Sequence, residues 1–564
     1  MNEPLIVQSD MTILVEAANP SYEKARDLLL RFADLEKSPE HVHTYRITPV
    51  SLWNAAASGL SSNEIVETLQ SLSKYPLPQN VEHEIREHTS RYGRLRMYST
   101  DDGLCLVSDD EAAILHAFNH PSVNPYIAGR LDARRLLVRP DCRGRVKQAL
   151  AKTGYPVEDL AGYTAGEPLD ISLREVTASG HPFRLRNYQR AAVARFHAGG
   201  SHSGGSGVIV LPCGAGKTIV AMGVMAEVKE QTLILSANVV ALRQWIDELL
   251  DKSNLTCDDI GEYSGEKKEI KPVTVSTYQT LTYAGPGGGH YPHLSLFSER
   301  NWGLIIYDEV HLLPAPVFRI TAELQARRRL GLTATLVRED GREDEVFSLI
   351  GPKRFDIPWK DLESEGWIAS ASCYEIRVEM DPDRRLQYAV ADEKNKYRIA
   401  SENPRKLDIV LALLRRHRDD RVLVIGQYLD QLHQIAEITG APLITGQVPN
   451  TQRRRLYEEF RNGDLSLLVV SKVANFAIDL PDANVAIQVS GTFGSRQEEA
   501  QRLGRILRPK KDGGRARLYS LVTRDTKDQE FGANRQLFLT EQGYAYTIMS
   551  ADELLAELKG ERPS

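Results

Sequence analysis

The stretch GVIVLPCGAGKT, residues 207–218, decides the fold class of this chain. GVIVL is a short run of apolar, mostly β-branched residues, typical of a parallel strand that is buried on both faces. A loop with two glycines follows it, and then TIVAMGVMAEVK, residues 218–229, has the pattern of a helix. A strand, a glycine-rich turn and a helix in this order are the context of a phosphate-binding loop.

The residues of this loop suit a bound triphosphate. Gly214 and Gly216 let the backbone turn with its N–H groups inward, and the start of the helix adds partial positive charge. Lys217 is placed to reach the β- and γ-phosphates, and the Thr218 hydroxyl to ligate Mg²⁺. The general pattern GxxxxGK[ST] has a glycine where this chain has Leu211. The predicted phosphate-contacting residues are Pro212, Cys213, Gly214, Ala215, Gly216, Lys217 and Thr218.

Short β-branched runs alternate with helical patterns through the rest of the chain. One set continues from the phosphate loop at 232–237, 273–278, 304–309 and 330–335. A second set lies at 421–427, 442–446, 465–472, 484–490 and 517–522. Runs of this kind separated by helices predict parallel sheets, and two sets predict two α/β domains. The charged, helical stretch 371–405 between them is interpreted as an inserted subdomain.

An acidic pair ends one of these strands. LIIY is followed by Asp308, Glu309, Val310 and His311. A carboxylate just past a buried strand suits Mg²⁺, a hard cation that prefers oxygen ligands, so Asp308 is the predicted ligand. Glu309 is placed to orient or activate an attacking water. A solvated acidic turn is the alternative, and the position about 90 residues after a phosphate loop disfavours it.

An arginine pair in the second α/β domain completes the predicted nucleotide site. In QRLGRILR, residues 501–508, Arg505 and Arg508 are three residues apart and share one helical face. They would reach across the cleft and neutralise charge on the transferring phosphoryl group. Because the loop and the arginines lie in different domains, the triphosphate is fully coordinated only when the cleft closes. Hydrolysis would then reopen it, which is the cycle of a motor.

The bulk properties exclude several classes of protein. The net charge of −6 argues against nonspecific coating of nucleic acid, but not against a grip on a few phosphates. The five cysteines are scattered without a CxxC pair, which disfavours disulfide frameworks, zinc sites and iron–sulfur clusters. Neither a secretory signal nor an apolar run long enough for a bilayer is present. These features favour a cytoplasmic protein that does not act on membranes.

Two smaller units precede the α/β domains. Residues 1–108 are interpreted as helices, including one across 20–37, followed by a hairpin around an Asp-Gly turn, an order that resembles a winged helix. Nucleic-acid contact and protein docking are equally compatible with it. Residues 109–180 are interpreted as a small α/β unit with a strand at 169–173. Its basic face carries Arg134, Arg135, Arg139, Arg143 and Arg145.

With these motifs in place, the chain resembles the XPB type of superfamily 2 helicases over about 181–545. The matches are FRLRNYQ (183–189), LGLTAT (330–335), RED (338–340), VVSKVANFAIDLP (469–481) and GSRQEEAQRLGRILRP (494–509). The chain lacks the acidic and basic tails expected of a eukaryotic member, so the resemblance implies a bacterial or archaeal form.

The resemblance implies the architecture. It is an α/β chain with two tandem RecA-like domains with parallel sheets, preceded by the winged-helix-like region and the small α/β domain. The implied boundaries are 1–108, 109–180 (damage-recognition-like), 181–370 (first RecA-like domain), 371–405 (thumb-like) and 406–564 (second RecA-like domain).

The resemblance also implies roles for further residues. Gln189 would read adenine, and Asp479 would lie near the γ-phosphate with Arg505 and Arg508. The implied coupling residues are Thr333, Thr335 and Gln501. The implied DNA contacts are Asn238, Arg243, Ser276, Thr277, Arg338, Thr445 and Gly446. Groups of these types at strand ends suit phosphates and predict little base specificity. Trp245 is interpreted as core packing.

The implied activity is that of an ATP- and Mg²⁺-dependent 3′→5′ DNA helicase in DNA repair, acting on duplex or forked DNA, with a nuclease or repair protein as partner. Three alternatives stay open. The chain could move along duplex DNA without separating strands, act as a nucleotide-switched scaffold, or unwind RNA, because the motor residues do not read a 2′-hydroxyl.

Overall fold

The computed structural model describes most of the chain, from residue 3 to residue 559. The residues outside the description are 1–2, 39–40, 140–141, 213, 285–290, 314–315, 318–319, 322–323, 325–326, 335–342, 358–361, 363–370, 472–482, 492–515, 542–543, 545 and 560–564. No helix in the described part combines the length and hydropathy that crossing a bilayer requires.

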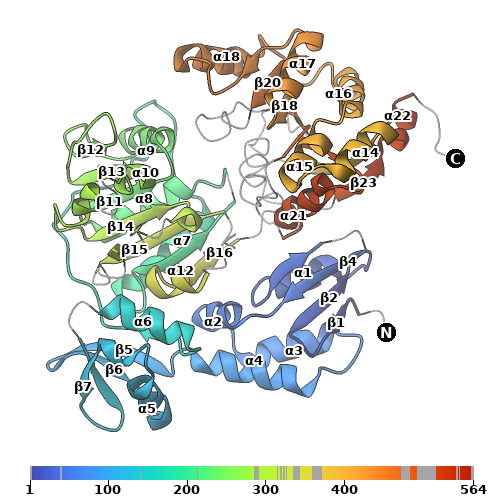
Figure 1. Ribbon diagram of the computed structural model, residues 1–564. Helices are drawn as coiled ribbons and strands as arrows, with labels where there is room; N and C mark the ends of the chain where they lie inside the picture. The colour runs from blue at the N-terminus through green and yellow to red at the C-terminus, as the bar shows by residue number, and fades with distance from the viewer. Residues whose placement is uncertain are drawn as a thin grey trace.

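The N-terminal unit is an antiparallel sheet packed against helices (Figure 1). Its strand order is β1-β2-β4-β3, and the helices α2 and α3 begin with capping boxes at Thr48 and Ser61. The elements are β1 (Leu5–Val7), β2 (Thr12–Glu16), α1 (Tyr22–Leu29), β3 (Asp34–Lys37), β4 (Val42–Arg46), α2 (Pro49–Ala57), α3 (Ser62–Leu72) and α4 (Gln79–Arg91). The helix predicted across 20–37 therefore ends at Leu29, and its last residues form the strand β3.

The second unit is a mixed five-stranded sheet with the order β7-β8-β6-β5-β9. Its elements are β5 (Leu95–Thr100), β6 (Gly103–Val107), α5 (Glu111–Asn119), η1 (Asn124–Tyr126), β7 (Ile127–Arg130), β8 (Arg135–Val138), α6 (Arg143–Lys152) and β9 (Val157–Asp159). The hairpin β5–β6, which the sequence interpretation joined to the preceding helices, pairs here with β8 and β9. The boundary between the two sheets thus falls before Leu95 rather than at 108, and 169–173 is not a strand.

Part of the basic face expected on this unit is used internally. Arg143 and Lys147 both bind the carboxylate of Asp159 at 2.8 Å, and all three side chains are largely buried. These two cations neutralise a buried carboxylate, so they are not exposed for contact with a DNA backbone. Arg134 and Arg135 remain on the surface, paired with Glu111 and Asp132.

The first RecA-like domain is a parallel sheet with the order β12-β13-β11-β14-β15-β10-β16 and helices on both faces (Figure 1). The strands are β10 (Ser206–Val210), β11 (Thr232–Ser236), β12 (Ile260–Tyr263), β13 (Val273–Thr277), β14 (Leu304–Asp308), β15 (Arg328–Thr333) and β16 (Lys353–Asp356). The helices are α7 (Asn187–His197), η2 (Ala198–Gly200), α8 (Lys217–Val228), α9 (Val239–Lys252), α10 (Tyr278–Leu281), η3 (Pro292–Phe297), η4 (Val310–Leu312) and α12 (Glu343–Leu349).

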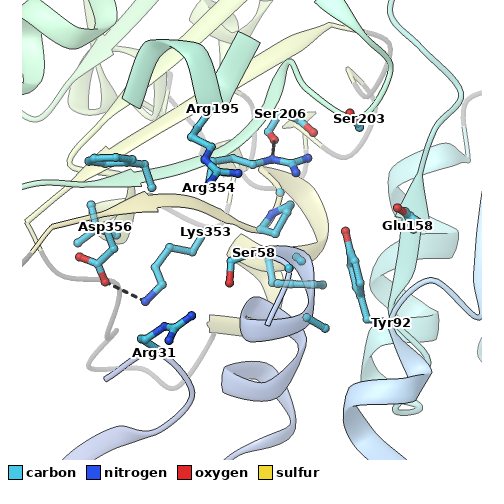
Figure 2. A pocket seen from close by; sticks show the side chains of 18 of the residues that line it. Arg31, Ser58, Tyr92, Glu158, Arg195, Ser203, Ser206, Lys353, Arg354 and Asp356 are labelled. Carbon is cyan, nitrogen blue, oxygen red and sulfur yellow. Dashed lines mark hydrogen bonds and ion pairs between the residues drawn. The ribbon is translucent and has the colours of Figure 1, made fainter. Parts of the chain in front are cut away.

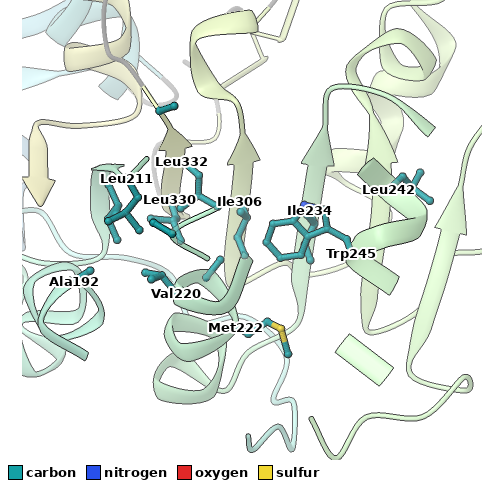
Figure 3. Packing of buried hydrophobic residues seen from close by; sticks show 14 of the residues in the cluster. Ala192, Leu211, Val220, Met222, Ile234, Leu242, Trp245, Ile306, Leu330 and Leu332 are labelled. Atoms are coloured by element: carbon teal, nitrogen blue, oxygen red, sulfur yellow. The ribbon is translucent and has the colours of Figure 1, made fainter. Parts of the chain in front are cut away.

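The five predicted strands of this domain are present, and the central strands are largely apolar and almost entirely buried. Figure 3 shows Ile234 of β11, Ile306 of β14 and Leu330 of β15 in one layer beneath the helices. Burying one such apolar side chain stabilises the fold by about 2 kcal/mol. This gain explains why these runs, and not their polar neighbours, form the sheet.

The second RecA-like domain is also a parallel sheet, with the order β19-β20-β18-β21-β22-β17-β23. The strands are β17 (Ala371–Val378), β18 (Val422–Gly426), β19 (Leu443–Ile444), β20 (Leu467–Ser471), β21 (Val485–Gln488), β22 (Ala516–Thr523) and β23 (Tyr546–Ser550). The helices are α14 (Pro382–Val390), α15 (Glu393–Ser401), α16 (Arg405–Arg416), α17 (Leu429–Thr439), α18 (Asn450–Asn462), α21 (Lys527–Glu541) and α22 (Ala551–Lys559). Residues 371–378, expected in a helical insertion, are β17, which pairs with β22 and β23. Only α14 and α15 match the helical interpretation of 371–405.

The N-terminal unit contacts both RecA-like domains. The amide N–H of Lys353 in β16 donates to the Asn54 side chain of α2 at 2.9 Å, and the rings of Trp53 and Phe347 lie 5.8 Å apart. On the other side, Leu537 of α21 belongs to the hydrophobic core of the N-terminal sheet. This unit therefore spans the two halves of the predicted motor.

Candidate nucleotide and magnesium site

The phosphate loop connects β10 to α8, as the sequence predicts. Gly214 and Gly216 adopt left-handed backbone conformations, with φ of 83° and 80°. The loop closes with a hydrogen bond from the Ala215 amide to the Pro212 carbonyl at 3.1 Å. Gly216 caps α8, so the N–H groups of the first helical turn face the loop. Lys217 and Thr218 are the first two residues of this helix, where a phosphate would be bound.

Helix α7 supports the loop from behind. The Tyr188 hydroxyl and the Gln189 amide group both donate to the Ala215 carbonyl, at 2.7 and 3.1 Å. The other side of the Gln189 amide accepts from the Arg186 backbone at 2.9 Å. Gln189 is thus joined to the phosphate loop, and its contact with adenine stays a prediction.

A substitution in the loop is expected to weaken nucleotide binding. A Cβ atom on Gly216 would lie 2.6 Å from Nε2 of Gln189, and the positive φ adds strain of roughly 1–2 kcal/mol. For Gly216→Ala we expect about a tenfold loss of affinity for a fluorescent ATP analogue. Gly440→Ala is the matched control, since its φ is +68° and a Cβ would meet nothing within 4 Å. Equal affinity of both variants would contradict the role of this cradle.

The acidic pair lies directly opposite the lysine of the loop. Glu309 has a left-handed backbone, with φ of 49°, and its carboxylate accepts an ion-paired hydrogen bond from Lys217 Nζ at 2.9 Å. Burial and the neighbouring Glu309 carboxylate raise the pKa of Asp308 to about 6. A carboxylate whose charge is disfavoured in this way fits a bound cation, which would favour the charged form. The surroundings of Asp308 therefore fit the predicted Mg²⁺ site, and the role of Thr218 stays a prediction.

Two contacts at this site were not foreseen from the sequence. Trp245 is 2% exposed, which confirms it as core packing, but its indole N–H also donates to Oδ2 of Asp308 at 2.9 Å. His311 and Thr333 join the ends of β14 and β15 through a side-chain hydrogen bond of 2.7 Å. The parallel neighbours β14 and β15 could have suggested the second contact, whereas no sequence pattern points to the first.

Most of the described residues expected to contact DNA lie at or just after the carboxyl ends of strands, whereas Arg243 lies within α9. Asn238 caps α9 and Thr277 caps α10 through their side chains. Ser276 is fully buried, while Arg243 is half exposed and pairs with Glu266 at 2.6 Å. The carbonyls of Thr445 and Gly446 accept from Arg453. The DNA contacts of these six residues stay predictions.

Seven predicted site residues lie outside the described residues. They are Cys213, Thr335, Arg338, Asp479, Gln501, Arg505 and Arg508. The wall that the second domain contributes to the nucleotide site therefore remains a prediction from the sequence.

A cavity of about 840 Å³ lies elsewhere, where the N-terminal unit, the small unit and the first RecA-like domain meet. Figure 2 shows Arg31, Ser58 and Tyr92 from the first of these, Glu158 from the second, and Arg354 and Asp356 from the third. Among the residues that the structure describes, no predicted nucleotide-binding residue lines it. This cavity is therefore separate from the predicted nucleotide site at the phosphate loop.

Three family models match the chain. They are the ERCC3/RAD25/XPB C-terminal helicase at 362–561, the helicase conserved C-terminal domain at 5–132, and the type III restriction enzyme, res subunit, at 182–338.

Curated relatives match along nearly the whole length. The chain is 54% identical to a DNA 3′-5′ helicase XPB of Mycobacterium tuberculosis, covering 98% of both chains. It is 34% identical to the general transcription and DNA repair factor IIH helicase/translocase subunit XPB of Antonospora locustae, covering 98% of this chain and 82% of the relative.

Among solved structures, the DNA-bound type ISP restriction-modification enzyme LlaBIII matches with a TM-score of 0.50 and 13% identity, covering 67% of this chain and 32% of that one. This last likeness concerns the fold alone.

Proposed function

Because the chain belongs to the XPB family of helicases, we propose that it is an ATP-driven 3′→5′ DNA helicase that uses Mg²⁺. The observation that carries the proposal is the convergence of Lys217, Asp308 and Glu309 at one loop, within a full-length relative of named DNA helicases. Phosphate, metal and water would meet at this loop.

The residues divide the work of hydrolysis. The backbone N–H groups of the loop and Lys217 would bind the phosphates, and Lys217 must leave Glu309 to do so. Thr218 and Asp308 would hold Mg²⁺, which supplies positive charge at the phosphoryl oxygens when bound. Glu309, released from Lys217, would orient the attacking water. Arg505 and Arg508 would complete the site from the second domain when the cleft closes.

Movement without strand separation is the second candidate, since the Antonospora locustae relative is named a helicase/translocase subunit. Both candidates share the same nucleotide site and differ only in what the motion does to DNA. The names of the relatives also support a place in DNA repair, with DNA as the partner. The residues predicted to contact DNA suit phosphates, so we expect little base specificity.

Paired assays on DNA test the proposal. We expect ATP hydrolysis to rise with forked DNA, and a fork with a 3′ tail to be unwound in preference to one with a 5′ tail. Single-stranded DNA and RNA are compared in the same assay. If the protein displaces a triplex strand but does not unwind the fork, its activity is that of a translocase and not that of a helicase. Hydrolysis that ignores all nucleic acids would overturn both.

A further inference from the structure

Two aromatic side chains from neighbouring helices hold Asp308. The indole N–H of Trp245, in α9, donates to its carboxylate at 2.9 Å. The hydroxyl of Tyr278, in α10, donates to its backbone carbonyl at 2.8 Å. The other carboxylate oxygen accepts the Glu309 backbone N–H at 3.1 Å. The predicted magnesium ligand is thus positioned by two elements outside its own strand.

Both helices begin at the edge of the sheet where DNA contacts are expected. Asn238 caps α9 seven residues before Trp245, a rise of about 10 Å, and Thr277 caps α10 directly before Tyr278. The Ser236 hydroxyl lies 3.1 Å from the carbonyls of both Asn238 and Ser276, so the two helix starts are joined. One end of each helix therefore borders the predicted DNA surface, and an aromatic group on each reaches Asp308.

The indole cannot move independently of α9. Trp245 is 2% exposed and packs in the core, and Figure 3 shows its ring between Ile234 of β11 and Ile306 of β14. A hydrogen bond of 2.9 Å weakens steeply when its atoms separate, so a small shift of α9 would change the hold on the carboxylate.

An indole N–H needs some acceptor when buried, and core satisfaction is the simpler explanation of the Trp245 contact. Trp302 shows that solution in the same domain: it is 1% exposed and donates to the Leu296 backbone carbonyl at 2.9 Å. Trp245 instead donates to the side chain of a predicted metal ligand, and Tyr278 makes a second contact with the same residue. Both contacts are therefore made to Asp308, one of the two predicted Mg²⁺ ligands.

We propose that Trp245 and Tyr278 are positioning residues that transmit DNA binding at the starts of α9 and α10 to the Mg²⁺ ligand Asp308. The proposal rests on the proposed DNA-stimulated hydrolysis. Partners of a metal ligand commonly change metal affinity by 10–100-fold when removed. DNA that alters the position of α9 would alter Mg²⁺ affinity in the same way.

The test compares Trp245→Phe and Tyr278→Phe, which keep the rings and remove one donor each. Trp302→Phe and Tyr263→Phe are the matched controls, because each removes a buried donor in the same domain away from Asp308. Mn²⁺ binding to the full-length protein with ADP is measured by electron paramagnetic resonance, with and without forked DNA. ATP hydrolysis is measured in parallel, and thermal unfolding reports whether each variant is folded.

We expect Trp245→Phe to weaken Mn²⁺ binding about tenfold and to lose the change that DNA causes in the wild-type protein. The ratio of DNA-stimulated to basal hydrolysis should fall at least about fivefold, and Tyr278→Phe should change in the same direction. The two control variants should have the Mn²⁺ affinity and the DNA stimulation of the wild-type protein.

Normal Mn²⁺ affinity and normal DNA stimulation in both variants would overturn this inference while leaving the helicase intact. Weaker Mn²⁺ binding with full DNA stimulation would also overturn it. In that case the two residues would position Asp308 but would not transmit DNA binding to it. A wild-type protein that DNA does not stimulate would instead reject the proposed function. If Trp245→Phe does not fold, Tyr278→Phe alone decides.

Discussion

Glu309→Gln is expected to lower ATP hydrolysis by about a thousandfold without weakening ATP binding. Glutamine keeps the shape of the side chain but cannot attract a proton from the attacking water. The left-handed backbone at Glu309 sets the direction of this side chain, and it faces Lys217 across the loop at 2.9 Å. A neutral amide at this position would leave phosphates and metal in place and remove the water-orienting charge.

The ion pair with Lys217 sets the expectation for binding. In the nucleotide-free protein Glu309 competes with phosphate for the lysine, so removing its charge should make ATP bind equally tightly or more tightly. Equilibrium titration with a fluorescent ATP analogue and single-turnover hydrolysis separate the two quantities. Lys217→Ala should lose both ATP binding and ATP hydrolysis. Glu227→Gln, on the exposed part of α8, should change neither of them. If the rate of ATP hydrolysis by Glu309→Gln stays within tenfold of the wild-type rate, another residue orients the attacking water.

The central strands of both motor domains could be predicted because a parallel strand covered on both faces is almost uniformly apolar. GVIV, LILS and LIIY fall in β10, β11 and β14, with the phosphate loop after β10 and the acidic pair at the end of β14. The convergence of Lys217 and Glu309 followed from the same reasoning, since the carboxyl ends of parallel strands meet at one edge of the sheet.

Two of the strands in the motor domains that escaped prediction carry charge. β16 reads KRFD at the edge of its sheet, and β17 contains Glu375 and Arg377 beside apolar residues. Glu375 is buried because Arg377 and the Gln536 side chain of α21 satisfy it, which only the tertiary structure provides. The strand β3 follows α1 so closely that the helical pattern masks it.

The missed contact at the site has a similar cause. Trp245 falls on the buried face of α9, so its apolar character was predictable. The acceptor of its N–H depends on how α9 crosses β14, where Asp308 lies 63 residues further along the chain. Sequence patterns describe which face is buried, and the identity of the polar partner requires the packing.

Lys406→Met is expected to destabilise the second RecA-like domain by about 3–5 kcal/mol. Lys406 and Asp528 are 0% exposed, and Lys406 Nζ donates to the carboxylate at 2.6 Å and to the Val489 carbonyl at 2.9 Å. Methionine fills the space of the stem but leaves Asp528 buried without its cation, supported by the Thr523 backbone N–H at 3.0 Å. Because the chain has several domains, hydrogen exchange in α16 and α21 measures the effect more directly than a global melting curve.

The size of the effect depends on burial, and a second ion pair in the same domain shows this. Lys527 and Glu530 are 2.9 Å apart but largely solvated, so Lys527→Met should leave the stability of the domain almost unchanged. Replacing both buried partners, Lys406→Met with Asp528→Leu, should restore much of the loss, since the penalty comes from the stranded carboxylate rather than from the missing attraction. If Lys406→Met exchanges no faster than Lys527→Met, the buried pair does not stabilise this domain. If the double variant is as unstable as the single one, the lost hydrogen bonds to Val489 and Thr523, rather than the unpaired charge, hold α16 and α21 in place.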